Sequence, residues 1–314
     1  MTVGTIVFMM VLVYAVILAM LALGLPSTAY AWGPGMHVDL ALHALADVSS
    51  FAPAIAELVR MFPQAFVYGA ASPDIIVGKR YYGYLHHCHS WRMGRLILAE
   101  AASDIQRAAA YGYLMHLAAD VVAHNYYIPV KVVRSYRARL LTHTYWEMRF
   151  DVGVPDEVWE RLEGITEQEI EEFDLLLERV LRKTLFTFST NKRIFNTILM
   201  IQKMRTMRKS LRAYAKRSRF GIGEENRQHY MDLALDSAQS FLREPESAPC
   251  LDMDPAGISR LDYASRLRRS IRATVRRGLM DETAADKLVE LVKERLALGL
   301  YRPEMVLPGV VDVL

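Results

Sequence analysis

Cysteine is scarce in this chain, and charge is missing from its start. The 314 residues include only Cys88 and Cys250, too few for a disulfide scaffold. The core must then be held by packing or by metal, with a single Cys88–Cys250 bridge as an option in an oxidising compartment. The formal net charge of +3 comes from nearly balanced basic and acidic residues. By itself it does not indicate a polyanionic partner.

The first 31 residues carry no charged side chain, and residues 7–23 are almost wholly apolar. The run ends in Ala-Tyr-Ala, a small-x-small motif typical of signal-peptide cleavage. We therefore predict a protein that is exported, to the periplasm or outside the cell, after cleavage following Ala31. The freed amine of Trp32 would then join the possible metal ligands. Because a basic start is missing and about 20 apolar residues can span a bilayer, a membrane anchor over residues 3–24 is the alternative.

The pattern after the leader is helical. Between Val38 and Leu300, apolar residues recur at spacings of three and four, without sustained alternation of period two. The sequence therefore predicts an all-α protein, a multi-helix domain with additional C-terminal helices. The expected helices of the first half are Asp39–Val48, Ala52–Arg60, Arg92–Tyr126 with a break near residues 102–104, and Val130–Phe150. Loops are expected at residues 69–74 and 81–90.

Composition changes near Gly153. Eight of the nine histidines precede it, and the helices after it are more strongly charged. We predict a histidine-rich domain over residues 32–154. A charged helical region over residues 155–314 either completes that domain or forms a second one.

Within the second region, residues 203–219 hold eight basic side chains with Met204, Met207, Leu211 and Tyr214 interleaved at helical spacing. This helix either lies on anionic lipid or packs on the domain with a solvated basic face. The small net charge favours packing.

Imidazole and carboxylate groups recur at helical spacing before Gly153. His116, Asp120 and His124 follow one another at i, i+4, which places all three on one face of a helix. His143 and Glu147 repeat the spacing. Alanine and valine around the first set indicate a buried helix, where unpaired carboxylates and imidazoles are costly and need partners or a metal. These five side chains are ligands of the kind that zinc prefers.

Six elements in order resemble the bacterial zinc-dependent phospholipase C family, across residues 32–151 and somewhat under half of the mature chain. They are Trp32, His37 five positions on, Pro73-Asp74, His89-Ser90-Trp91, His116-x-x-x-Asp120 and His143-x-x-x-Glu147-x-x-x-Asp151. The resemblance implies an all-helical domain that holds three zinc ions in a cleft.

The resemblance also implies an assignment of ligands. Trp32, through its freed amine and its carbonyl, would join His37 and Asp120 at one zinc. Asp74, His89 and His116 would hold a second, with Asp120 bridging the two. His124, His143 and Glu147 would hold the third, which would keep open positions for water and a phosphate oxygen. Asp74, as ligand or base, is the candidate catalytic residue for proton handling.

Some of these positions have rivals. His86, His87 and Cys88 are donors that compete with His89, which we prefer because Ser90-Trp91 follows it as in the family. Asp120 and His124 are closer in sequence than the corresponding residues of most family members. Asp151 either orients His143 or Arg149 or is a surface carboxylate.

The predicted function is exported, phospholipase C-type hydrolysis of a phospholipid by metal-bound hydroxide, with peripheral contact to an anionic membrane as an option. One alternative is a zinc nuclease or phosphatase, since single-strand-specific zinc nucleases resemble this site. Tyr81, Tyr82, Tyr84 and Trp91 could then stack bases, or equally floor a lipid headgroup pocket. The other alternative is a membrane-tethered helical binding protein with a structural metal site, which a retained leader would favour. The sequence identifies no protein partner.

Overall fold

The computed structural model describes residues 32–76, 88–138, 143–161, 167–181, 186–204 and 224–313, with a few single positions between 204 and 224. These residues form helices joined by turns, without a strand among them, which confirms the predicted all-α class. The α-helices are α2 (Pro34–Ala46), α3 (Pro53–Met61), α4 (Pro63–Ala71), α5 (Trp91–Ala99), α6 (Asp104–Val122), α7 (Ile128–Arg134), α8 (His143–Asp151), α9 (Asp156–Arg161), α10 (Glu167–Val180), α11 (Phe188–Lys203), α13 (Glu224–Arg243), α14 (Ile258–Arg276) and α15 (Glu282–Leu298). Short helical turns are η1 (Val48–Ser50), η2 (Ser72–Ile75), η7 (Pro249–Asp252) and η8 (Val310–Asp312), and η5 (Ala123–Tyr127) is a π-helix.

Helices of the first half begin at recognisable start signals. Proline occupies the first position of α2, α3 and α4, where its fixed φ fits the helix and its missing N–H is not needed. The hydroxyl of Ser90 accepts a hydrogen bond from Met93 N, and that of Ser103 accepts one from Gln106 N, each at 3.2 Å. These caps fix where α5 and α6 begin.

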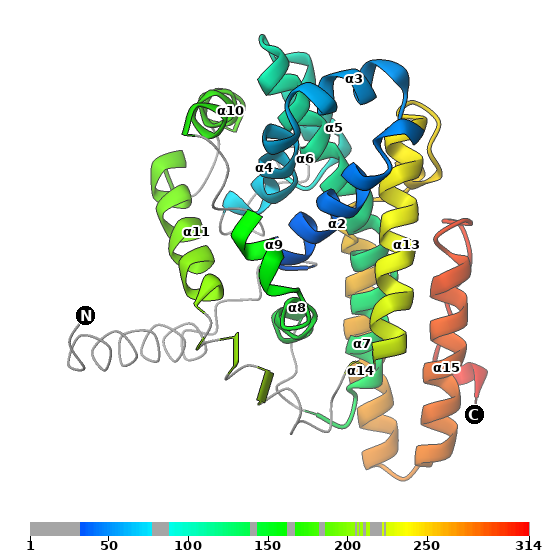
Figure 1. Cartoon of the computed structure of the whole chain (residues 1–314). Coiled ribbons are helices and arrows are strands. Elements are labelled where there is room, and N and C mark those ends of the chain that lie inside the picture. The colour runs from blue at the N-terminus through cyan, green and yellow to red at the C-terminus, as the bar shows by residue number, and fades with distance from the viewer. Residues whose placement is uncertain are drawn as a thin grey trace, which may run out of the picture.

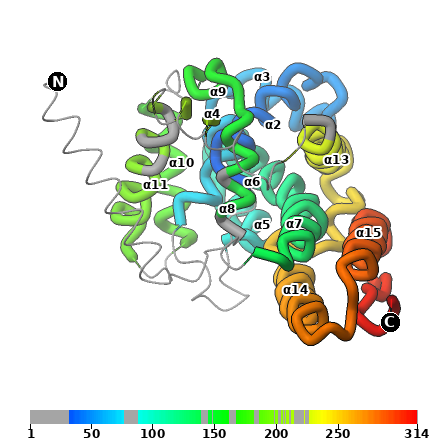
Figure 2. Tube along the Cα trace, turned by 90° about the horizontal axis from the view of Figure 1, so that it is seen from below, coloured from blue at the N-terminus to red at the C-terminus, as the bar shows by residue number. Residues whose placement is uncertain are grey.

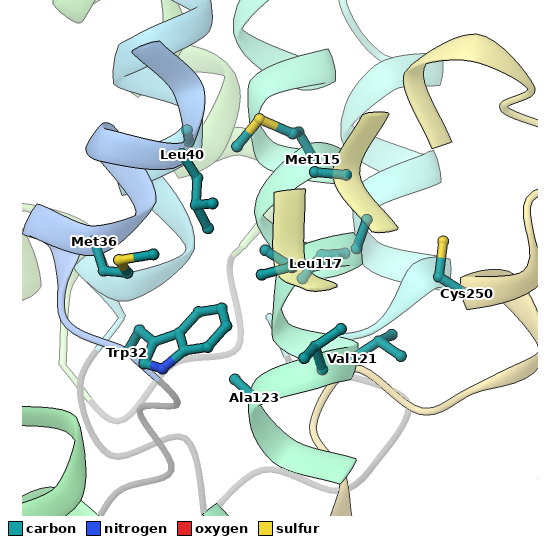
Figure 3. Close-up of a cluster of buried hydrophobic side chains, with 14 of the residues drawn as sticks. Trp32, Met36, Leu40, Met115, Leu117, Val121, Ala123 and Cys250 are labelled. Carbon is teal, nitrogen blue, oxygen red and sulfur yellow. The ribbon is translucent and has the colours of Figure 1, made fainter. Parts of the chain in front are cut away.

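Helix α6 is the centre of the molecule and packs against α4, α13, α5 and α10 (Figure 1). Its crossing with α4 is close because each helix presents a glycine. A Cβ added at Gly69 would meet the backbone of Ala109, and one at Gly112 would meet the carbonyl of Phe66. The apolar side chains around α6 form the core, with Trp32 and Met36 to one side of this helix and Cys250 to the other (Figure 3).

Two flanks border this centre. Helices α10 and α11 lie on one flank, and α14 and α15 lie on the other (Figures 1 and 2). Helix α7, which continues the line of α6 beyond the π-helix, packs against both α14 and α15. The C-terminal helices therefore contact the continuation of the same helix that carries His116 and Asp120.

Two expected boundaries are wrong. The helix predicted over Val130–Phe150 is two helices, because α7 ends at Arg134 in a turn and α8 begins at His143. The loop predicted at residues 69–74 is instead the end of α4 followed by η2. In both places apolar spacing alone could not locate the interruption.

The structure also bears on the predictions for the two cysteines, the apolar leader and the basic segment. Both cysteines are buried free thiols. Residues 1–31 and most of residues 205–221 lie outside the described part, and among the helices that are described none is long and apolar enough to cross a membrane. In the basic segment, Arg208 and Arg212 both contact Asp156 at 3.1 and 3.0 Å. These two cations are thus packed on the domain.

Candidate metal centre

Three of the predicted ligands lie along the central helix. His116 and Asp120 are one turn apart on α6, and His124 follows on η5. None of the three has exposed surface. Asp120 Oδ2 lies 3.1 Å from His116 Nε2 and 3.8 Å from His124 Nδ1. The spacing of four residues therefore brings an imidazole to each side of one buried carboxylate.

The two oxygens of Asp120 face different groups. Oδ1 lies 3.3 Å from Nε2 of His37, which comes from α2. Oδ2 lies 3.3 Å from Nε2 of His89 and 3.1 Å from Nε2 of His116. A carboxylate with one oxygen toward each of two donor groups has the arrangement that a bridging ligand needs. Its position on a regular turn of α6 fixes this orientation.

Asp74 and His89 reach the same place from segments on either side of the gap at residues 77–87. Asp74 is in η2, and His89 immediately precedes the cap of α5. His89 Nε2 lies 3.4 Å from Asp74 Oδ1 and 3.1 Å from His116 Nε2. Two overlapping groups result, His37–Asp74–His116 and His89–His116–Asp120, each with its donor atoms within 4.8 Å of one another. Both groups are buried, so each could enclose a metal ion.

Backbone carbonyls orient two of the imidazoles. Nδ1 of His116 lies 2.7 Å from the carbonyl oxygen of Ala70, and Nδ1 of His124 lies 2.5 Å from that of Pro255. A carbonyl only accepts, so the proton of each ring is on Nδ1 and the lone pair is on Nε2. An Nδ1–H to carbonyl bond is the usual support of a metal-ligating histidine.

The buried polar atoms at the centre do not satisfy one another by hydrogen bonding, which favours a bound metal. Among the described residues, neither ring nitrogen of His37 and neither oxygen of Asp120 has a hydrogen-bond partner, although all four are buried. The 3.3 Å approach of His37 to Asp120 therefore lacks hydrogen-bond geometry. Buried polar groups without partners are costly. A cation shared among nitrogen and oxygen donors, the ligand set of zinc, would remove that cost.

The pKa shifts of His37 and Asp120 favour the protonation states that bind a metal. Burial lowers the pKa of His37, and the neighbouring His116 lowers it further. Burial alone would raise the pKa of Asp120, but His116, His124 and His37 together hold it well below its usual range. Neutral imidazole and ionised carboxylate are the forms that bind metal.

Trp32 is fixed beside this centre. Its side chain has no exposed surface, and its ring lies 6.2 Å from that of His37, 6.1 Å from that of Tyr127 and 5.1 Å from that of Phe150. The indole is thus held between α2, η5 and α8, and Figure 3 shows it beside Met36. The start of the described chain is anchored next to a predicted ligand.

Helix α8 brings the last predicted residues to the same side. Glu147 is buried on it, whereas the side chain of His143 lies outside the described residues. Asp151 is neither a surface carboxylate nor a partner of Arg149. It is 6 % exposed, and its Oδ1 accepts a hydrogen bond from Met36 N at 3.1 Å, which caps α2 from another helix. Gly33 is required there, because a Cβ would run into the Asp151 carboxylate.

The structure describes one of the three donors that rival His89, namely Cys88. His86 and His87 lie outside the described residues. Cys88 Sγ lies 3.4 Å from Nδ1 of His89, on the side of the ring away from the Nε2 atom that faces Asp74, Asp120 and His116. Cys88 therefore supports the His89 ring from behind.

Sequence reasoning missed the contribution of residues 253–257 to this centre. Their carbonyls accept hydrogen bonds from residues beside and within the cluster, including His124. Asp254-Pro-Ala-Gly257 indicates a turn in the sequence. Nothing in that signal ties the turn to a histidine more than 130 residues earlier.

The chain matches a known protein family over part of its length. Residues 36–185 match a family model described as zinc dependent phospholipase C. The match covers slightly less than half of the chain and includes every predicted ligand except Trp32. No curated protein and no solved structure matches the chain.

Proposed function

We propose, from the match of residues 36–185 to the zinc-dependent phospholipase C family, that the protein is an exported zinc hydrolase that cleaves the phosphodiester of a phospholipid on the diacylglycerol side. The observation that carries the proposal is the orientation of Asp120, whose two oxygens each lie within 3.3 Å of different imidazoles at a fully buried position. Such a carboxylate is suited to two dications held side by side.

We propose about three zinc ions, the number that the family resemblance implies, held by nitrogen and oxygen donors of the kind that zinc prefers. In the proposal Asp120 would be shared between two zinc ions, one of them also held by His37 and the backbone of Trp32, and the other by His89, His116 and Asp74. His124, Glu147 and His143 would hold the third. When bound, zinc supplies the acidity that makes water a nucleophile at neutral pH and the positive charge that offsets charge on phosphoryl oxygens.

The residues of the chain contribute orientation and proton handling. The carbonyls of Ala70 and Pro255 accept hydrogen bonds from Nδ1 of His116 and of His124 and so orient the two rings. Asp74, one of whose oxygens faces His89, is the group that we propose to receive or return a proton during hydrolysis. These groups are buried among apolar side chains, and such surroundings strengthen the electrostatic interactions within the site.

We further propose that cleavage after Ala31 frees the amine of Trp32 for zinc. The position of the buried Trp32 ring beside His37 supports this step. An α-amino group has an ordinary pKa near ~8, so a nearby dication readily takes it in its neutral form. Export and assembly of the metal site would then be coupled.

The test uses the full chain, exported and purified without chelator. Zinc per chain and the N-terminal residue are measured on the same sample. Hydrolysis is then compared on phosphatidylcholine vesicles and on single-stranded DNA, before chelation, after chelation and after zinc is returned.

We expect about three zinc ions on a chain that starts at Trp32, and vesicle hydrolysis that chelation abolishes and zinc restores. Cleavage of DNA without cleavage of lipid would replace the proposal with a nuclease. A chain that starts at Met1 or binds little zinc would favour the tethered binding protein, because Trp32 would then have an amide in place of the amine.

A further inference from the structure

A short segment of the C-terminal half lies directly against the metal cluster. Three successive carbonyl oxygens of this segment accept hydrogen bonds from side chains of the first half. Trp91 Nε1 donates to Met253 O at 2.8 Å, Asn125 Nδ2 donates to Asp254 O at 2.9 Å, and His124 Nδ1 donates to Pro255 O at 2.5 Å. We name residues 253–257 the carbonyl loop. It lies outside the residues that match the family model.

The shape of the carbonyl loop is set by its own residues. The side chain of Asp254 accepts from Ala256 N and from Ile258 N, each at 3.0 Å, and so holds the loop at the start of α14. Gly257 has φ 58° and ψ 28°, the left-handed region that favours glycine. A Cβ added there would lie 2.5 Å from the Cβ of His124. Only glycine therefore allows the loop to approach His124 this closely.

His124 needs such support more than His116 does. His116 lies within the regular part of α6, but His124 lies in the π-helix η5, where the hydrogen-bond register that would fix a helical side chain is altered. The neighbouring Asn125 donates both to Val121 O within the helix and to Asp254 O in the loop, each at 2.9 Å. The loop thus holds two consecutive residues of the π-helix.

We propose that the carbonyl loop is a positioning element for His124, so that the C-terminal half completes a metal site whose predicted ligands all lie in the first half. The Pro255 carbonyl fixes the proton of His124 on Nδ1, and Gly257 provides the space for that contact. The proposal rests on the proposed function only in that zinc is the ion to be held. The hydrogen bond itself exists without metal.

Helix α14 offers a matched pair of variants. Gly257 precedes it and Gly278 follows it, and both have positive φ, 58° and 70°. A Cβ at Gly278 meets nothing within 4 Å, whereas one at Gly257 meets His124. Gly257→Ala and Gly278→Ala therefore share the strain of a left-handed alanine. They differ in the collision with His124.

Two readouts are made on the full-length protein. Zinc titration gives the number and affinity of the sites. Nitrogen-detected NMR of the histidine rings in zinc-free protein reports which nitrogen of His124 carries the proton. We expect Gly278→Ala to match the wild type in both. We expect Gly257→Ala to weaken one zinc site by about 10- to 100-fold, the usual effect of losing an outer-shell partner, and to give His124 a mixture of tautomers.

Equal zinc affinities for the two variants together with an unchanged Nδ1–H of His124 would overturn the proposal.

If Gly257→Ala does not fold, Asn125→Ala takes its place, because it removes the hydrogen bond to Asp254 O without adding an atom. It should weaken the same zinc site, and unchanged zinc affinity and tautomer would count against the loop. A wild type that binds no zinc but keeps the Nδ1–H state would refute the proposed function and leave the positioning role standing.

Discussion

Two groups of ionisable side chains lie along the line of α6, η5 and α7, and they differ in exposure and in their partners. On α6 and η5, His116, Asp120 and His124 have no exposed surface. Beyond the end of α7, Arg137 is 43 % exposed and pairs with Glu282 and Asp286 of the α15 helix, each at 3.1 Å. The first group is fully buried, and the second is exposed to solvent.

The difference shows which feature indicates function. The exposed arginine already has carboxylate partners, and water screens what the pairs contribute. The buried Asp120 has several imidazoles around it but no hydrogen bond to either oxygen among the described residues. An aspartate is present at both places, Asp120 at one and Asp286 at the other. Burial without satisfied hydrogen bonds among the described residues separates the candidate site from the exposed ion pairs.

The largest expected effect comes from Asp120→Asn. The amide keeps the shape of the side chain but lacks the charge, and one of its two ends presents N–H groups to imidazoles on one side. We expect two zinc ions to be lost together and hydrolysis to fall by more than the roughly 100-fold that outer-shell changes reach. Metal analysis and vesicle hydrolysis measure both. Unchanged zinc content would rule out the bridging role.

An intermediate effect is expected at Asp151, a second buried carboxylate, whose Oδ1 accepts a hydrogen bond from Met36 N. Burial, together with the charge of Asp74, raises its pKa to about 7, against the hydrogen bonds from the backbone of Met36 and Gly35. The folded state therefore favours the protonated carboxyl. The stability that this group contributes is complete below pH ~4 and is lost as the pH rises through about 7.

Asp151→Asn should remove this dependence, because asparagine stays neutral and its oxygen can still accept from Met36 N. Between pH 4 and 7, the free energy of unfolding of zinc-free wild type should fall relative to the variant by up to about 4 kcal/mol. Urea unfolding at several pH values measures it. Parallel curves for the two proteins would show that Asp151 is ionised like an exposed carboxylate.

The sequence predicts the helical class and the grouping of His116 with Asp120, since both follow from local periodicity. It could not predict the role of Asp151, whose partner Met36 is 115 residues away. It also could not predict the π-helix at His124. The ring of His124 donates to the carbonyl of Pro255, 131 residues further on. Local pattern identifies the donors on one helix. The contacts that orient them come from long-range packing, which no spacing rule encodes.

The smallest expected effect comes from Arg137→Gln. The change removes both ion pairs with Glu282 and Asp286, but exposed pairs contribute only about 0.2–1 kcal/mol each because water and side-chain entropy offset the attraction. Urea unfolding should show a loss of about 1 kcal/mol, smaller still in high salt, with zinc content unchanged. A double-mutant cycle with Asp286→Asn isolates one pair. A coupling of several kcal/mol would mean that water does not screen this end of the line of helices, and exposure would then no longer separate the two groups of charges.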